Sequence, residues 1–164
     1  MKRKQLTIFL DQTEAKAIEQ IRQVFNPAQY RLIKAHITLC REDEIENLEH
    51  VLRNLRQLKM RQFELTTRPP QRFWEGKGVF IPIDDSKGLF QKLRARILQN
   101  GITSLRTHEA HITLMHPRNS TCDDAKFEAI QKVNIPEQLT IAKISLIEQE
   151  MGEVWEVLDE FILG

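Results

Sequence analysis

The pentapeptide AHITL occupies residues 35–39 and occurs again, letter for letter, at residues 110–114, a shift of 110 − 35 = 75 positions. In a strand, side chains alternate between the two faces. Each copy would therefore place its histidine and threonine on one face and its isoleucine and leucine on the other. The apolar face must be buried under a helix. Each copy is thus expected to present a His–Thr pair on the opposite face of its sheet.

The recurrence extends beyond the pentapeptide. The tetrapeptide IFLD at residues 8–11 is answered by IPID at residues 81–84 (81 − 8 = 73), and Val79 is answered by Val154 (154 − 79 = 75). Periods of two and of 3.6 residues predict the elements between these markers. We expect strands over residues 6–10, 32–40, 63–67, 79–83, 110–115, 139–147 and 154–162, and helices over residues 11–25, 44–58, 84–98 and 123–133. Two halves with one element order indicate an internal repeat.

The repeat predicts an α+β fold with a pseudo-twofold axis. We expect residues 1–164 to form a single bilobal domain, with an internal repeat of about 1–80 and 81–164 and with strands partly exchanged between the lobes. Each lobe would hold an antiparallel sheet. The two sheets would surround a central cleft, with the helices outside.

Such a cleft suits the cleavage of a phosphodiester. His36, Thr38, His111 and Thr113 would converge on it if both His–Thr faces point inward. An imidazole with a pKa near 6.5 exists in either protonation state close to neutral pH. One histidine can accept a proton from the attacking water or hydroxyl while the other donates a proton to the leaving oxygen. The threonine hydroxyls can donate to the non-bridging phosphoryl oxygens. The two halves are too alike for the sequence to say which histidine is the base.

Paired H-x-T-apolar motifs in two matched halves resemble the signature of the 2H phosphoesterase superfamily, which includes the bacterial RNA 2′,3′-cyclic phosphodiesterases also described as 2′-5′ RNA ligases. Here the motifs read HITL at residues 36–39 and 111–114. The resemblance implies the bilobal 2H phosphoesterase fold. It also implies metal-independent acid–base chemistry, without a cofactor, on 2′,3′-cyclic phosphate ends of RNA or nucleotides, with 2′-5′ RNA ligation as a reverse reaction. Members differ in substrate, so the resemblance predicts the chemistry better than the pathway.

Further residues could hold the substrate. Cationic side chains that follow the two strands could bind a phosphate, and aromatic side chains beside an arginine in the connector over residues 68–78 could stack on a base. The candidate substrate-binding residues are Arg118, Arg41, His116, Phe73, Trp74 and Arg72. The alternative for the arginines is an ordinary surface position. Phe73 and Trp74 could equally fill a small core between hairpin and helix.

The amino-acid composition limits the kinds of molecule that the chain is expected to bind. The 24 basic and 23 acidic side chains give a formal charge of +1, whereas a protein that wraps long nucleic acid usually carries a clear basic excess. We therefore expect an RNA end or a small nucleotide with a cyclic phosphate as partner. Cys40 and Cys122 form no CxxC pattern, and no apolar run approaches the ~18 residues of a membrane span. These features predict a cytoplasmic monomer that binds neither a membrane nor a metal.

Two other functions compete with the enzyme. A non-catalytic module that binds nucleotides or RNA ends could use the same scaffold, although pure binding would not require two titratable histidines. A metal-dependent hydrolase could use His108, His111 and His116. However, HEAH over residues 108–111 is not the HExxH zinc motif, and if the strand extends as far as residue 108, alternation puts His108 on the face opposite His111. The duplicated His–Thr pair favours the enzyme.

Overall fold

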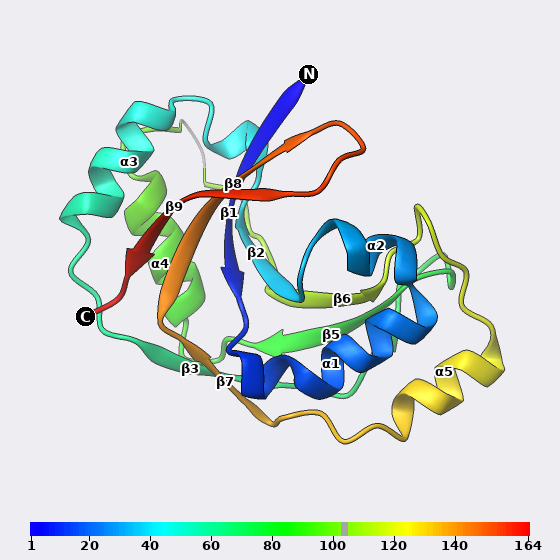
Figure 1. Ribbon diagram of the computed structural model, residues 1–164. Coiled ribbons are helices and arrows are strands. Elements are labelled where there is room, and N and C mark those ends of the chain that lie inside the picture. Colours follow the sequence, from blue (N-terminus) through cyan, green and yellow to red (C-terminus); the bar gives the residue numbers. More distant parts are fainter. Residues whose placement is uncertain (103–104) are drawn as a thin grey trace.

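The computed structural model describes residues 1–102 and 105–164 of the chain, in which strands and helices are mixed (Figure 1). The elements, in chain order, are β1 (Lys2–Phe9), α1 (Gln12–Phe25), α2 (Pro27–Leu32), β2 (His36–Cys40), the 3-10 turn η1 (Glu42–Glu44), α3 (Leu48–Gln57), β3 (Phe63–Thr67), β4 (Gln71–Arg72), β5 (Val79–Asp84), α4 (Leu89–Leu98), β6 (His111–Met115), α5 (Asp124–Gln131), β7 (Gln138–Ile141), β8 (Lys143–Glu150) and β9 (Glu156–Ile162). Within these ranges, no helix combines the length and the apolar character needed to cross a membrane. The predicted α+β class is confirmed.

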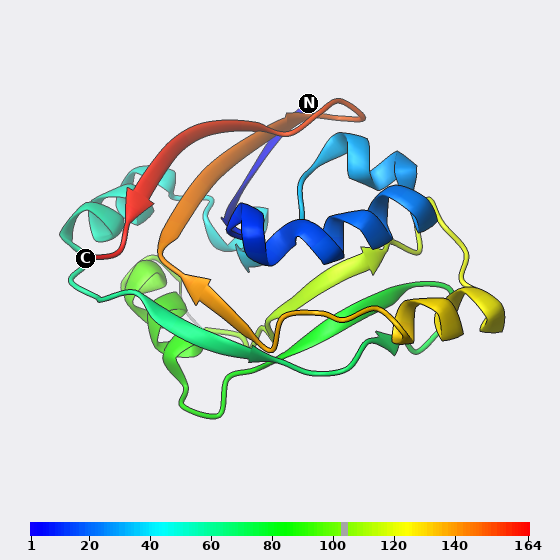
Figure 2. The same cartoon turned by 60° about the horizontal axis from the view of Figure 1, so that its bottom comes forward.

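The strands join into one antiparallel sheet in the order β7-β3-β5-β6-β2-β1-β8-β9, with β4 beside β5. At its centre, β2 and β6 meet through one residue pair, Ile37 with Ile112. The two predicted sheets are therefore the two halves of a single curled sheet, β7-β3-β5-β6 and β2-β1-β8-β9. In Figure 2, the pair β8–β9 and the pair β3–β5 lie on opposite sides of the molecule, which gives it its bilobal shape.

Each half of the sheet uses strands from both halves of the chain. β3, from the N-terminal half, pairs with β5 and β7, while β8 and β9, from the C-terminal half, extend the sheet beyond β1. The register repeats between the halves, since Phe9 lies opposite His36 in β1–β2 and Pro82 lies opposite His111 in β5–β6. The two motif histidines therefore occupy equivalent positions at the start of the two central strands.

The hydrophobic core lies on the isoleucine and leucine face of the central strands. The motif side chains on this face, Ile37, Leu39, Ile112 and Leu114, are at most 1% exposed. The same core cluster holds apolar side chains of the two helices that follow β1 and β5, namely Ile18 and Ile21 of α1 and Phe90, Leu93 and Ile97 of α4. Burial of the Ile/Leu face, predicted from strand alternation, is confirmed.

Two helices begin later than the sequence pattern predicts. α3 starts at residue 48 instead of 44, because Glu44 ends a 3-10 turn in which its buried carboxylate accepts the backbone N–H of Arg41, and Asn47 then caps the helix. α4 starts at residue 89, because Gly88 turns the chain with a φ of 69°. Asp85 caps the helix, since its carboxylate accepts the N–H groups of the first two residues after Leu89.

One predicted strand is split in two, another begins four residues late, and β4 is not predicted at all. The strand expected over residues 139–147 breaks at Ala142 into β7, which pairs with β3, and β8, which pairs with β1. The strand expected over residues 32–40 begins only at His36, because Pro27 starts a second helix, where its missing N–H is not needed. The break at Ala142 is where the chain crosses from one half of the sheet to the other.

Candidate active site

The four polar side chains of the duplicated motif share one face of the central strands. Because the two central isoleucines pair directly, alternation places His36 across from Thr113 and Thr38 across from His111, all on the face away from the core. We call this surface the His–Thr face. All four side chains are half-buried. The structure thus brings the predicted catalytic residues together, with the two histidines as diagonal neighbours.

A backbone carbonyl holds each histidine ring. Nδ1 of His36 donates to the carbonyl oxygen of Lys34 at 2.7 Å, and Nδ1 of His111 donates to that of Glu109 at 3.0 Å. In both cases the acceptor lies two residues before the histidine. A ring held through Nδ1–H keeps its Nε2 lone pair when neutral and gains Nε2–H when protonated. Nε2 is therefore the atom at which either ring can exchange a proton with a substrate.

The two histidine rings have different neighbours. Phe80 and Phe73 lie edge-on to His111, with ring centroids at 5.8 and 6.2 Å, and they pack against each other at 4.6 Å. Phe9 lies edge-on to His36 at 6.1 Å. Of the two aromatic residues predicted in the connector, Phe73 is thus part of the site, as a wall beside His111.

Burial sets the protonation state of His36. Loss of hydration lowers its pKa to about 4, and the positive charges of Arg22, His111 and His116 act in the same direction. The hydrogen bond to Lys34 offsets only part of this effect. His36 is therefore neutral near pH 7 and able to accept a proton.

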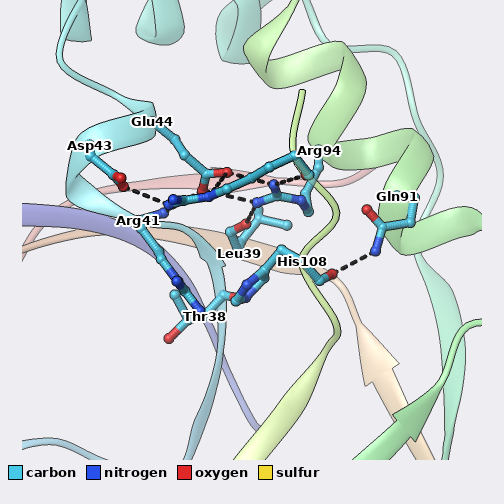
Figure 3. A network of polar contacts seen from close by, with 9 residues as sticks. Thr38, Leu39, Arg41, Asp43, Glu44, Gln91, Arg94 and His108 are labelled. Carbon is cyan, nitrogen blue, oxygen red and sulfur yellow. Dashed lines mark hydrogen bonds and ion pairs between the residues drawn. The ribbon is translucent and has the colours of Figure 1, made fainter. Parts of the chain in front are cut away.

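Three of the predicted substrate-binding cations follow the two central strands. Arg118 donates its backbone N–H to Nδ1 of His116 at 3.1 Å, and its guanidinium lies 3.4 Å from Nε2 of the same ring. Burial and the nearby charges of Arg118 and Arg3 lower the pKa of His116. The Arg41 side chain extends toward Thr38 (Figure 3). Arg41 and Arg118 are exposed, so both are accessible to an anion.

Arg72 and Trp74 have other surroundings. Arg72 uses all three guanidinium nitrogens within the protein, on the carbonyl oxygens of Gly76 and Cys122, both at 2.9 Å, and on the carboxylate of Asp124 at 2.7 Å. It therefore holds the connector between β4 and β5, and each of its nitrogens already has a partner in the protein. Trp74 is 97% exposed, so the core position that the sequence also allowed does not hold.

His108 lies beside the site although it is outside the motif. It is 5% exposed, and its Nε2 donates to the carbonyl oxygen of Thr38 at 2.9 Å (Figure 3). Its ring centroid lies 6.1 Å from that of His111. The condition for it to face away from His111 is not met, because β6 begins only at residue 111 and strand alternation does not reach residue 108. Burial lowers the pKa of His108 to about 4. A neutral His108 thus links the segment before β6 to β2.

The three histidines of the metal alternative are engaged with protein groups. Nε2 of His108 and Nδ1 of His111 donate to backbone carbonyls, while Nδ1 of His116 accepts a backbone N–H. Across residues 1–102 and 105–164, no three His, Cys, Asp or Glu side chains are grouped so that they could hold a metal ion. The arrangement of these donors therefore does not favour the metal-dependent hydrolase.

A groove of about 1180 Å³ lies next to the His–Thr face, between α1, α2 and β9. Two of its lining residues, Phe9 and Lys34, are neighbours of His36. Its charged side chains balance, with Lys16, Arg31, Lys34 and Lys143 against Asp11, Glu14, Glu19 and Glu160. This balance gives the groove no preference for an anionic strand, which agrees with the near-neutral charge of the chain.

The chain matches the sequence model of a known protein family. The family model of the 2′-5′ RNA ligase superfamily matches residues 10–153. The chain belongs to the 2′-5′ RNA ligase superfamily. The resemblance to the 2H phosphoesterases is thereby confirmed, and membership supports a phosphoesterase- or ligase-type function on phosphodiesters. No curated protein matches the chain.

Solved structures show how this superfamily member is folded. E. coli LigT in apo form matches with a TM-score of 0.71 at 17% sequence identity, over 99% of this chain and 97% of LigT. A crystal structure described as a phosphoesterase matches with a TM-score of 0.68 at 16% identity, over 99% of both chains. TT0787 of Thermus thermophilus gives 0.62 at 16%, over 98% of this chain and 97% of TT0787. The predicted 2H phosphoesterase fold is therefore confirmed.

Proposed function

We propose that this superfamily member hydrolyses 2′,3′-cyclic phosphate ends of RNA or nucleotides, with His36 as general base and His111 as general acid, and that it forms 2′-5′ RNA linkages when an RNA hydroxyl replaces water. The observation that carries the proposal is the paired anchoring of the rings. Each Nδ1 donates to a backbone carbonyl, which leaves each Nε2 for proton exchange. A site that only binds nucleotides has no need of two rings held in this way.

In the hydrolytic reaction, a water molecule attacks the phosphorus of the cyclic phosphate. His36, kept neutral near pH 7 by a pKa of about 4, accepts the proton that the water loses. A new P–O bond forms while one ring P–O bond breaks. His111, protonated at Nε2, gives its proton to the departing ribose oxygen. The products are a phosphomonoester and a free ribose hydroxyl, and the two histidines regain their initial states by exchanging protons with solvent.

The other polar groups of the site stabilise the phosphoryl oxygens. The hydroxyls of Thr38 and Thr113 lie across from the two histidines and donate to the non-bridging oxygens, where negative charge is held in the transition state. Arg41 and Arg118, at the ends of the two strands, supply positive charge around the same phosphate, and the His116 ring lies beside Arg118. Phe73 forms a wall on which the base or ribose can pack.

Ligation uses the same roles with a different nucleophile. A ribose 5′-hydroxyl takes the place of water and loses its proton to His36. The P–O5′ bond forms, the P–O3′ bond breaks, and His111 protonates the 3′-oxygen. The result is a 2′-5′ linkage. Structures of E. coli LigT complexed with phosphate, with 3′-AMP and with NADP+ support a partner of nucleotide size for this fold.

The test is a turnover assay on a 2′,3′-cyclic nucleotide, a cyclic-phosphate RNA end and a 2′-5′ dinucleotide, with EDTA present throughout. Replacing either His36 or His111 by Ala should lower kcat by something on the order of 10²–10⁴. The double replacement should lower it by far less than the product of the two, because the groups act as one unit. His50→Ala is the matched control, since His50 lies on α3 and bonds the carbonyl of Gln99.

Two results would redirect the proposal. Tight binding of the cyclic nucleotide without turnover by the wild-type protein would favour the non-catalytic binding module. Activity that disappears in EDTA and returns with a divalent ion would favour a metal-dependent hydrolase.

A further inference from the structure

We propose that two side-chain pairs outside the motif position the catalytic histidines by holding the backbone in front of them. The α1 clamp consists of Glu19 and Arg22, and the α4 clamp consists of Gln91 and Arg94. The inference deepens the proposed function and rests on it, because the clamps matter for catalysis only if the two histidines exchange protons with a substrate.

The α1 clamp grips both sides of the residue that anchors His36. Arg22 is 1% exposed, and its Nη2 donates to the carbonyl oxygen of Ile33 at 2.8 Å. Its Nη1 pairs with the Glu19 carboxylate, which in turn accepts the N–H of Ala35 at 3.2 Å. The residue between these two contacts supplies the carbonyl that holds Nδ1 of His36. Any shift of this segment would therefore turn the imidazole.

The α4 clamp holds two carbonyl groups of the segment before His111, both of them ahead of the residue that anchors its ring. Arg94 is fully buried, and its Nη2 donates to the carbonyl oxygen of Arg106 at 3.1 Å. Gln91 donates through Nε2 to the carbonyl oxygen of His108 at 2.6 Å (Figure 3). The next residue, Glu109, supplies the carbonyl that holds Nδ1 of His111.

The two clamps occupy equivalent positions in the repeat. The helix residues are separated by 91 − 19 = 94 − 22 = 72 positions, and the backbone groups that they hold by 106 − 33 = 108 − 35 = 73. In both arginines, Nε has no hydrogen-bond partner among the described residues, so each guanidinium works through its Nη atoms. These shifts are within three positions of the 75 that separates the two motifs, so the clamps belong to the same internal repeat.

The α4 clamp also holds the strand of the other histidine. The Arg94 guanidinium donates to the carbonyl oxygen of Leu39 on β2 and pairs with the Glu44 carboxylate at 2.6 Å (Figure 3). Glu44 accepts the N–H of Arg41 at 2.8 Å, where β2 ends. The backbone ladder between β2 and β6 is one pair long, so these side chains carry much of the link between the halves. They thereby set the spacing between the histidines.

A buried ion pair is a weak source of stability, because loss of hydration offsets much of the attraction between the charges. Each clamp instead holds, in one fixed conformation, a backbone segment that lies outside the β-strands. The α1 clamp also places a charge near His36. The titratable and charged groups that act on His36 are Arg22 from α1 and, from β6 and the residue that follows it, His111 and His116.

The test compares Arg22→Gln, Arg22→Lys and Gln91→Ala with the wild-type protein, by steady-state kinetics on a 2′,3′-cyclic nucleotide and by NMR titration of the His36 ring. Arg22→Gln should lower kcat about 10- to 100-fold with KM changed less than about threefold, since misplaced catalytic groups reduce turnover more than binding. It should also raise the pKa of His36, because a positive charge is removed. Arg22→Lys should restore that pKa and part of kcat. Gln91→Ala, at a half-buried position, should lower kcat and leave the His36 titration unchanged.

Arg53→Gln is the control, because it breaks the exposed Arg53–Glu49 pair of α3 and should change neither readout. Circular dichroism at the assay temperature gives the folded fraction of each variant. Glu19→Gln, which keeps an acceptor for Ala35, replaces Arg22→Gln should the latter fail to fold. Folded variants with wild-type kcat, or losses of kcat equal to the unfolded fraction, would overturn the inference. If the wild-type protein turns over no cyclic phosphate, the proposed function fails, and the titration of His36 alone tests the α1 clamp. A raised pKa of His36 in Arg22→Gln then supports the clamp, and an unchanged pKa overturns it.

Discussion

His36 and His111 have equivalent anchors and different surroundings. Both rings donate through Nδ1 to the carbonyl two residues earlier, but Arg22 acts on His36, while Phe73 and Phe80 flank His111. The pentapeptide repeat is enough to predict the four residues of the His–Thr face. It cannot predict the division of labour, because burial and charge come from α1 and from the β4–β5 connector, which are distant in sequence.

The pKa of His36 gives the acid limb of the activity profile. If His36 is the base, kcat/KM should be constant down to about pH 5 and fall as pH decreases through about 4, when His36 takes up a proton. The measurement is kcat/KM from pH 3.5 to 9, with the folded fraction followed at each pH. An acid limb near pH 6.5 would show that burial does not depress this histidine and would contradict the assignment.

Replacing either threonine should lower kcat without changing how kcat/KM depends on pH. Thr38→Ala and Thr113→Ala each remove a donor to the phosphoryl oxygens, so kcat should fall about 100- to 1000-fold, the range for loss of one such donor. Thr→Ser at the same positions keeps the hydroxyl and serves as the matched control. The limbs of the pH profile should stay in place, because a hydroxyl does not titrate in this range. A wild-type rate in both Ala variants would remove the threonines from the mechanism.

At the scale of the elements, local periodicity predicts most of the fold and fails where a tertiary contact takes over. α1 begins as predicted because its cap, Asp11, is adjacent in sequence. α3 does not, because Glu44 is drawn into a pair with Arg94, which is 94 − 44 = 50 residues away. The break at Ala142 likewise depends on two different pairing partners, β3 and β1, which no local pattern contains.

The sequences of α1 and α4 share a further feature that the spacing of their apolar residues does not reveal. An arginine follows the apolar stripe of both helices at matching places, Ile18-Glu19-Gln20-Ile21-Arg22 in α1 and Phe90-Gln91-Lys92-Leu93-Arg94 in α4. On an exposed face such an arginine would mean little. Its recurrence on the buried side of both copies of the repeat is the sequence evidence for the clamps, and alignment of the two halves at a shift of 72 makes it visible.

The connector between β4 and β5 offers a test of how an element supports the site. A Cβ at Gly78 would lie 2.6 Å from Cδ2 of Phe73 and 2.8 Å from both the carbonyl oxygen of Met115 and Cδ of Pro117. Gly78→Ala must therefore displace the wall beside His111, and it should lower the free energy of unfolding by roughly 1–3 kcal/mol, as overpacking does. It should also lower kcat. Lys77→Ala, at the exposed neighbouring position, is the control for both urea unfolding and turnover. Unchanged stability of Gly78→Ala would contradict the predicted clash.

At the scale of the whole molecule, the two halves of the sheet meet through a short contact, reinforced by side chains. One backbone pair joins β2 to β6, and His108 and Arg94 add hydrogen bonds from the second half of the chain to the β2 carbonyls. The sequence predicts the two halves because they repeat. It does not predict this junction, because His108 and Arg94 stand outside the motif and act on residues about 55 to 70 positions away.

The junction should make the stability of the whole molecule depend on pH in two separate windows. A histidine whose pKa is lowered by folding stabilises the folded protein fully above its unfolded pKa, near 6.5, and loses this contribution as pH falls through its folded pKa. His36 and His108, both with pKa values of about 4, therefore give a first window from about pH 6.5 to 4, in which His108 alone accounts for roughly 3 kcal/mol. Burial by itself would raise the pKa of Glu44, but hydrogen bonds from Arg94 and the N–H of Arg41 lower it to about 2, so its contribution is present above about pH 4.5 and is lost toward pH 2.

Urea unfolding between pH 8 and 3 should thus show falling stability in both windows. His108→Gln, which keeps a donor for the Thr38 carbonyl and does not titrate, should reduce the loss of stability in the first window to the share of His36 and leave the second window in place. If the variant and the wild-type protein lose stability in parallel between pH 6.5 and 4, His108 is not the neutral link between the two halves.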